Sequence, residues 1–168
     1  MKLLHIGCGP RLLPGWINID IEQPTETISE GIEFIQVDAA ETLPFHDGKV
    51  SAIYSEDFVE HLTQQQQWNF YAECFRVLKP SGWCRTITPN LLAVLADSDF
   101  AKGSQGVVDV WHWGHPCVMS RTMLADLGKA IGFYVWDTAH MCDMMPPDTR
   151  PHTPIPDNHS LSMDFRKP

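Results

Sequence analysis

The sequence predicts an α/β fold, a doubly wound sheet with helices between its later strands. Three observations support this prediction. Short runs rich in apolar and β-branched residues recur along the chain, several of them end in a glycine turn or an acidic residue, and helical periodicity appears only after residue 60. In doubly wound sheets, ligands bind beyond the carboxyl ends of the strands. We therefore expect the functional residues at one edge of the sheet.

The first two predicted strands enclose a glycine turn. The apolar run 3–6 breaks at Gly7 and Gly9, and the run 17–19 ends at Asp20. Glycine accepts unusual backbone angles and has no side chain to keep a ligand away. An acid at the tip of the next strand can accept hydrogen bonds from ribose hydroxyls. Together these residues predict a site for a nucleotide-like cofactor.

The next two strands repeat the pattern of a strand followed by an acid. Residues 32–37 stop at Asp38, and residues 50–55 are followed by Glu56 and Asp57. Residues 21–31 contain a proline and few apolar positions, so they predict a loop. Four separate strand ends thus place polar residues or glycines where a ligand would bind.

Helical signals dominate the middle of the chain. Thr63 and Gln66 form a capping-box pattern before a helix that runs to Leu78, with apolar residues at three- and four-residue spacing. Residues 79–82 end that helix, and a fifth strand is predicted over residues 83–88.

The remaining elements are less regular. The sequence predicts a short helix over residues 91–95, a long loop to residue 118, a helix over 120–131 that Gly132 stops, and strands at 133–136 and 161–165. Between the last two strands lies a proline-rich segment, predicted with Met144 and Met145 to form a lid or packing loop.

Composition narrows the class of protein. The 168 residues predict one domain over 1–168 with an ordinary globular core, since 43% are hydrophobic and 20% charged. The net charge of −9, without a basic cluster, argues against nucleic acid or an anionic membrane as a partner. Five scattered cysteines predict reduced thiols and a cytoplasmic location. No apolar stretch has the length of a membrane span.

Several motifs together resemble one known family. They are the glycine turn 5–10, Asp20, Asp38-Ala39, Glu60-His61-Leu62 and Arg76-Val77-Leu78-Lys79-Pro80-Ser81-Gly82. This combination resembles the class I S-adenosylmethionine-dependent methyltransferases, in particular the small bacterial type 11 group. The resemblance covers residues 3–89 well and the remainder loosely. It implies a Rossmann-like sheet of seven strands, mostly parallel, with an antiparallel last strand.

The resemblance also implies which residues hold S-adenosylmethionine. Gly7, Cys8 and Gly9 would bind the methionine part through their backbone groups. Asp20 would bind the ribose hydroxyls and Ile21 would lie against the adenine. The adenine edge would be read by Asp38 and Ala39, and the floor near the sulfonium would be formed by Ser55 and Glu56.

The chain departs from the family in its first half. His5 stands where the family usually has an acid. Only residues 10–16 connect the first two strands, whereas a helical crossover needs about a dozen. The helices before and after the first strand are therefore expected to be reduced or absent, and one sheet face would be bare. Residues 90–118, the proline-rich segment or a second subunit would cover it, and we prefer a homodimer through that face.

The identity of a general base stays open. His61 and Glu56 are the candidate catalytic residues, with His115 as a further candidate, and His61 could equally have a structural role at the start of the helix. Residues His112, His115 and Cys117 have a metal-like spacing but no clear fourth ligand, so no metal is predicted. With Trp111 and Trp113, His115 is better explained as an aromatic wall over a substrate pocket or over the sheet.

These observations predict a methyltransferase that modifies an oxygen or nitrogen atom of a small molecule. The alternative is a catalytically silent S-adenosylmethionine-binding or assembly protein of the same fold. A nicotinamide-dependent reductase is disfavoured, because the chain lacks G-x-G-x-x-G and a helix N-terminus for a pyrophosphate.

Overall fold

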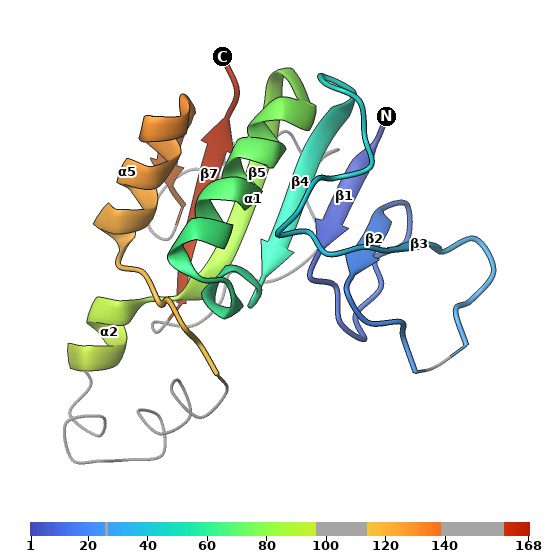
Figure 1. The fold of residues 1–168 in the computed structure, drawn as a ribbon, viewed down its shortest axis with the longest axis horizontal. Helices are drawn as coiled ribbons and strands as arrows, with labels where there is room; N and C mark the ends of the chain where they lie inside the picture. Colours follow the sequence, from blue (N-terminus) through green and yellow to red (C-terminus); the bar gives the residue numbers. More distant parts are fainter. Residues whose placement is uncertain (26, 97–113, 139–159) are drawn as a thin grey trace.

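Seven strands form one sheet in the order β3-β2-β1-β4-β5-β7-β6 (Figure 1). The structure is a computed structural model that describes residues 1–25, 27–96, 114–138 and 160–168. The strands are β1 (Leu3–Ile6), β2 (Ile17–Asp20), β3 (Glu33–Gln36), β4 (Val50–Glu56), β5 (Leu78–Pro89), β6 (Tyr134–Asp137) and β7 (Ser160–Arg166). The first five strands pair in parallel, and β7 runs antiparallel to both β5 and β6. The predicted fold class is confirmed.

The helices follow the predicted signals. They are the 3-10 turn η1 (Val59–His61) and the α-helices α1 (Gln64–Val77), α2 (Leu91–Ala96) and α5 (Arg121–Ile131). Thr63 and Gln66 form the predicted capping box at α1. Ser120 caps α5, and Gly132 ends it in the left-handed conformation with a φ of 117°. Among the described residues, none of these helices combines the length and apolar character that a bilayer crossing requires.

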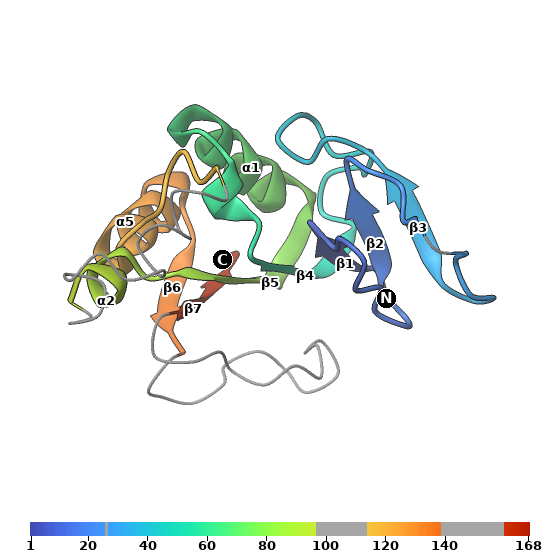
Figure 2. The same cartoon turned by 90° about the horizontal axis from the view of Figure 1, so that it is seen from below.

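The main core lies between the sheet and the two longer helices. Figure 2 shows α1 and α5 on the same side of the sheet. Leu4 and Ile53 from the central strands pack there with Phe70 and Tyr71 of α1 and with Phe165 of β7, and all five are fully buried. Burial of large apolar side chains is the main favourable contribution to folding, so this face anchors the sheet.

The opposite face has no helix among the described elements. β1 and β2 are joined by residues 7–16 without a helix, as predicted from the short crossover. That crossover supplies Trp16, which is buried against Tyr54 and Ala52 and is joined by partly buried Leu13. The sequence did not predict this role. Part of the helix-poor face is thus covered within one chain by the segment that replaces the missing helix.

The start of β5 differs from the prediction. Residues 79–82 were expected to separate α1 from the strand, but β5 begins at Leu78. Its pairing with β4 is irregular, because Val50 pairs with Leu78 while Ala52 pairs with Trp83. β5 therefore has more residues than β4 between these two pairs. Backbone hydrogen bonds between Lys167 and both Ser81 and Gly82 hold this part of β5 in place. Those bonds come from the far end of the chain, so local sequence could not indicate them.

Several predictions concern residues outside the described ranges. They are the aromatic wall at Trp111 and Trp113, the role of His112, most of the loop to residue 118, and the proline-rich segment with Met144 and Met145.

Candidate functional site

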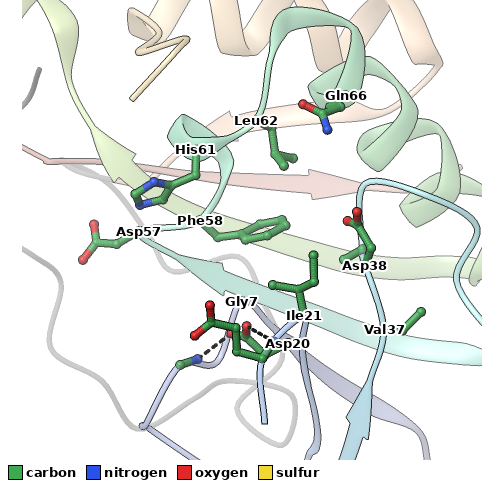
Figure 3. Close-up of a pocket in the computed structure, with 13 residues that line it drawn as sticks. Gly7, Asp20, Ile21, Val37, Asp38, Asp57, Phe58, His61, Leu62 and Gln66 are labelled. Carbon is green, nitrogen blue, oxygen red and sulfur yellow. Dashed lines mark hydrogen bonds between the residues drawn. The ribbon is translucent and has the colours of Figure 1, made fainter. Parts of the chain in front are cut away.

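A cavity of about 560 Å³ lies at the carboxyl ends of β1, β2, β3 and β4 (Figure 3). Its walls come from the glycine turn, from the ends of β2 and β3, and from the segment after β4. The lining residues are Gly7, Gly9, Asp20, Ile21, Glu22, Val37, Asp38, Ala39, Asp57, Phe58, His61, Leu62 and Gln66. In the view of Figure 3, Asp38 and Gln66 lie at one end of the cavity and His61 and Asp57 at the other. The volume is typical of a small-molecule site.

Gly7 is required at its position for two reasons. Its φ of +67° lies in the left-handed region, which L side chains rarely adopt. A Cβ atom built at Gly7 would also lie 2.5 Å from the ring of Phe58. The glycine therefore lets the turn after β1 pack directly against the segment after β4, and this contact closes one side of the cavity.

The amide groups of the glycine turn are used within the protein. The N–H groups of Gly7 and Cys8 both donate to the carbonyl oxygen of Ile19, over 2.9 and 3.2 Å. The N–H of Gly9 donates to Oδ2 of Asp20. A polar contact from Gly7 or Gly9 to a ligand would thus use the carbonyl oxygens. Carbonyl oxygens accept hydrogen bonds from an ammonium group, such as that of a methionine moiety.

Cys8 does not line this cavity. It is 4% exposed and faces a neighbouring recess of about 280 Å³. Burial raises the pKa of its thiol to about 11, so the thiol is neutral at physiological pH. Any contribution of Cys8 to ligand binding would come from the backbone, as expected.

Asp20 is fixed by two backbone donors. Besides Gly9, the N–H of Glu22 donates to its Oδ1 over 3.1 Å, so the carboxylate cannot swing away from the cavity. Each carboxylate oxygen has a second lone pair, which leaves Asp20 able to accept from ligand hydroxyls. Beside it, Ile21 is 60% exposed and offers an apolar surface to the cavity.

Asp38 and Ala39 stand where β3 ends. Oδ1 of Asp38 accepts from the N–H of Ala40 over 2.9 Å, which orients the carboxylate at the mouth of the loop. The loop that follows is held by Arg76 of α1, whose guanidinium donates to the carbonyl oxygens of Phe45 and Leu43. This contact gives a structural reason for the arginine in the family-like segment 76–82, which begins in the last turn of α1.

Ser55 and Glu56 lie elsewhere than expected. Neither is among the residues that line the cavity. Ser55 is fully buried beneath α1, where its hydroxyl lies 3.3 Å from that of Thr86. Glu56 points to the opposite face of the sheet, where it pairs with Arg11 and accepts from the hydroxyl of Tyr54. Strand alternation explains the difference, because neighbouring residues of β4 face opposite sides.

His61 lies between the main cavity and a smaller one. The second cavity has a volume of about 270 Å³ and is lined by Asp57, Glu60, His61, Pro89 and His115. Asp57 and His61 therefore line both cavities. The rings of His61 and His115 meet edge to face, with centroids 4.6 Å apart. The structure thus brings together two of the three candidate bases, and it separates Glu56 from them.

Glu60 is a functional candidate that the sequence prediction did not select. It is buried and accepts a hydrogen bond from the hydroxyl of Thr88 over 2.9 Å. Burial raises its pKa to about 7. Burial, and then the neighbouring His61, lowers the pKa of His115 and favours its neutral imidazole. Groups with such shifted pKa values in a cleft are typical of functional sites.

Asp57 and Phe58 complete the cavity and were also missed. Asp57 adopts a φ of 49°, which is unusual for a residue other than glycine. Strained backbone of this kind is found at functional sites when the surrounding structure enforces it. Their position directly after a predicted strand was the feature of the sequence that could have identified them. The sequence analysis noted Asp57 as an acid at the end of a strand but gave it no role.

Comparison with known proteins agrees with this geometry. Residues 4–86 match the family described as Methyltransferase domain. A curated relative, a probable S-adenosylmethionine-dependent methyltransferase of Mycolicibacterium smegmatis, is 32% identical over 96 residues. That alignment covers 57% of this chain and 33% of the relative, so the aligned part spans about a third of the relative's length.

Solved structures share the fold across the chain. A methyltransferase of Archaeoglobus fulgidus has a TM-score of 0.67 at 17% identity, with 99% of this chain and 86% of that chain covered. A chain in the complex between the Haloferax volcanii Trm112 methyltransferase activator and a putative methyltransferase has a TM-score of 0.66 at 14% identity, covering 99% and 82%. The matched domain, which covers just under half of the chain, and the shared fold make this chain similar to S-adenosylmethionine-dependent methyltransferases.

Proposed function

We propose that this protein transfers a methyl group from S-adenosylmethionine to an oxygen or nitrogen atom of a small-molecule acceptor. The observation that carries the proposal is the cavity that joins the glycine turn, Asp20 and Asp38 to His61. Its polar groups fit the cofactor. Carbonyl oxygens are available for an ammonium group, and carboxylates are held for ribose hydroxyls and an adenine amine.

Different residues would bind different parts of the cofactor. Gly7 and Gly9 would bind its methionine part, Asp20 its ribose, and Ile21, Asp38 and Ala39 its adenine. When bound, the cofactor supplies an electrophilic methyl group on a sulfonium. The protein would mainly align the acceptor behind that methyl group and exclude water.

The acceptor would enter from the smaller cavity at His61. Its volume of about 270 Å³ supports a small molecule, and the net charge of −9 disfavours nucleic acid. During transfer a bond forms from the acceptor oxygen or nitrogen to the methyl carbon while the carbon–sulfur bond breaks, and the acceptor loses a proton. His61 is best placed to take that proton, because it lines both cavities. Glu56 forms an ion pair with Arg11, which supports His61 over Glu56 as the general base.

A turnover assay tests this function. The full chain would be incubated with S-adenosylmethionine and a panel of alcohols, phenols and amines, and S-adenosylhomocysteine formation would be measured beside cofactor binding. Acceptor-dependent product formation that falls in His61→Ala supports the proposal. Cofactor binding without turnover of any acceptor would favour the silent binding or assembly protein instead.

Three further expectations stay predictions. A single domain over residues 1–168, a cytoplasmic location and a homodimer through the helix-poor face are supported by composition and by the lack of a described helix on that face. Ala52 and Tyr54 pack with Trp16 on the helix-poor face and are fully buried within one chain. A dimer interface on that face would therefore have to use the residues around them. Light scattering tests it, and a monodisperse monomer would contradict it.

A further inference from the structure

Three potential metal ligands converge beside the cofactor cavity. Glu60 and His61 come from η1, and His115 comes from the segment before α5. One ligand atom from each lies within 4.8 Å of the other two. We propose that these three residues bind one divalent transition-metal ion, such as Zn²⁺ or Co²⁺. Two imidazole nitrogens and one carboxylate oxygen are the protein ligands of several catalytic zinc and non-haem iron sites, which keep further positions open for substrate.

The ligands are held by a second layer of contacts. Thr88 donates to the Glu60 carboxylate over 2.9 Å, as outer partners of metal ligands commonly do. Gln67 donates from Nε2 to the carbonyl oxygens of Val59 and Cys117, over 2.7 and 2.9 Å. These bonds tie η1 to the segment that carries His115, although the two are far apart in sequence. The site is therefore built by the fold rather than by chance proximity of flexible side chains.

One ring atom of the cluster has no hydrogen-bond partner among the described residues. The Nδ1 atom of His115 is buried and, within the described part of the chain, has no hydrogen-bond partner. Buried polar atoms are nearly always paired, because leaving one without a partner is costly. A metal ion at one ring nitrogen fixes the tautomer and the orientation of such a ring.

The geometry needs only a small adjustment. Metal–ligand distances of about 2.0–2.2 Å place neighbouring ligand atoms about 3–3.5 Å apart. The present atoms lie within 4.8 Å of one another, so shifts on the order of 1 Å would close the site. His61 is exposed and can make most of that movement by side-chain rotation, while Glu60 stays fixed in the core.

A metal here would change how the acceptor is activated. Activation of the acceptor by the metal rests on the proposed methyltransferase function, whereas metal binding by the three residues does not. A hydroxyl of the acceptor bound to the metal has a lowered pKa, so it releases its proton to water before it attacks the methyl carbon. His61 would then act as a ligand and would not be needed as a base. The site would select acceptors with an oxygen or nitrogen donor that can coordinate.

Titration with Co²⁺ tests the inference, because visible absorption bands report its coordination. The full chain, stripped of metal with EDTA, should bind one Co²⁺ ion, and Zn²⁺ should displace it. Glu60→Gln, His61→Ala and His115→Ala should each weaken binding by about tenfold or more. His46→Ala is the matched control, since His46 is exposed and is not part of the cluster, and the affinity of this variant for Co²⁺ should equal that of the wild type.

Two results would overturn the inference. One is no Co²⁺ binding at millimolar concentration, and the other is binding that persists unchanged in the His61→Ala/His115→Ala double variant, which would assign the ion to other histidines. His61 is exposed, so His61→Ala remains informative if His115→Ala disturbs the fold. S-adenosylhomocysteine binding in EDTA is measured in parallel. If it persists without metal binding, only the metal inference fails.

Discussion

The N–H of Gly9 donates a hydrogen bond to Oδ2 of Asp20 over 2.8 Å. This bond joins the turn after β1 to the tip of β2, and it does so without a helix between these strands. The carboxylate of Asp20 thus has a structural role as well as the proposed cofactor role. It holds the shape of the turn and faces the cavity at the same time.

Replacing Asp20 should weaken cofactor binding more than it weakens the fold. In Asp20→Asn the charged acceptor for the ribose hydroxyls is lost. Hydrogen bonds to charged groups contribute about 1.5–3 kcal/mol, so affinity for S-adenosylhomocysteine should fall about 10- to 150-fold by calorimetry. Glu33→Gln is the control, because Glu33 is an exposed acid of β3 outside the cavity, and its affinity should not change. Equal affinities in all three proteins would contradict the role of Asp20.

The contact between Gly7 and Phe58 predicts a difference between two glycine substitutions. Both Gly7 and Gly15 have positive φ, and alanine there should cost about 1–2 kcal/mol of unfolding free energy. A Cβ at Gly7 meets the Phe58 ring, whereas at Gly15 no atom lies within 4 Å. Gly7→Ala should therefore be less stable than Gly15→Ala by a further 1–3 kcal/mol or so. Urea denaturation measures both, and equal losses would show that the Phe58 contact is not tight.

Most of the fold could be predicted because its signals are local. Several strands are short apolar runs before a glycine or acid, and the caps of α1 and α5 were correct at Thr63, Ser120 and Gly132. The early start of β5 could not be predicted, since Lys167 holds it from a distant position.

Site residues that directly follow a strand could be predicted from the sequence. Site residues whose place depends on which face of the sheet they point to, or on contacts between distant segments, could not. Gly7, Gly9, Asp20 and Asp38 line the cavity as expected. Ser55 is fully buried and is not among the residues that line the cavity. The sequence does not indicate how far a strand continues before its residues reach that cavity. The approach of His115 to Glu60 and His61 depends on the hydrogen bonds of Gln67, which join segments about fifty residues apart, and no sequence pattern indicates them.

Because the His5 ring is buried, its contribution to stability should depend on pH. It is 1% exposed, its Nδ1 lies 3.1 Å from Oδ1 of Asn18, and burial lowers its pKa from 6.5 to about 4. Between these values the His5 ring binds more protons in the unfolded chain than in the folded chain, so its contribution to stability should fall as pH falls from 6.5 to 4. The raised pKa of Glu60 acts in the opposite direction over this range. The contribution of His5 is up to about 3 kcal/mol.

The comparison is between pH profiles of unfolding free energy. His5→Asn removes the titrating ring, so the unfolding free energy of the wild type should fall relative to that of His5→Asn as pH falls from 6.5 to 4. His46→Asn, at an exposed histidine, should keep the wild-type slope. If His5→Asn also keeps the wild-type slope, His5 is not buried in its neutral form.

Gln67 should be essential for the second cavity. Its Nε2 bridges the carbonyl oxygens of Val59 and Cys117, and its side chain is fully buried. Gln67→Leu would leave two carbonyl oxygens without this donor, at a cost of about 1–3 kcal/mol each. Thermal unfolding should show a clear loss of stability, whereas Gln64→Leu, at an exposed position on the same helix, should change it little. Similar melting temperatures for both variants would argue against the bridge.

The central claim is that the cavity beyond β1, β2 and β3 binds S-adenosylmethionine. Isothermal titration of the purified chain with S-adenosylmethionine and S-adenosylhomocysteine tests it most directly. The account predicts saturable binding of both ligands at one site per chain, with affinity lowered in Asp20→Asn. The absence of binding by either ligand at millimolar concentration would contradict it.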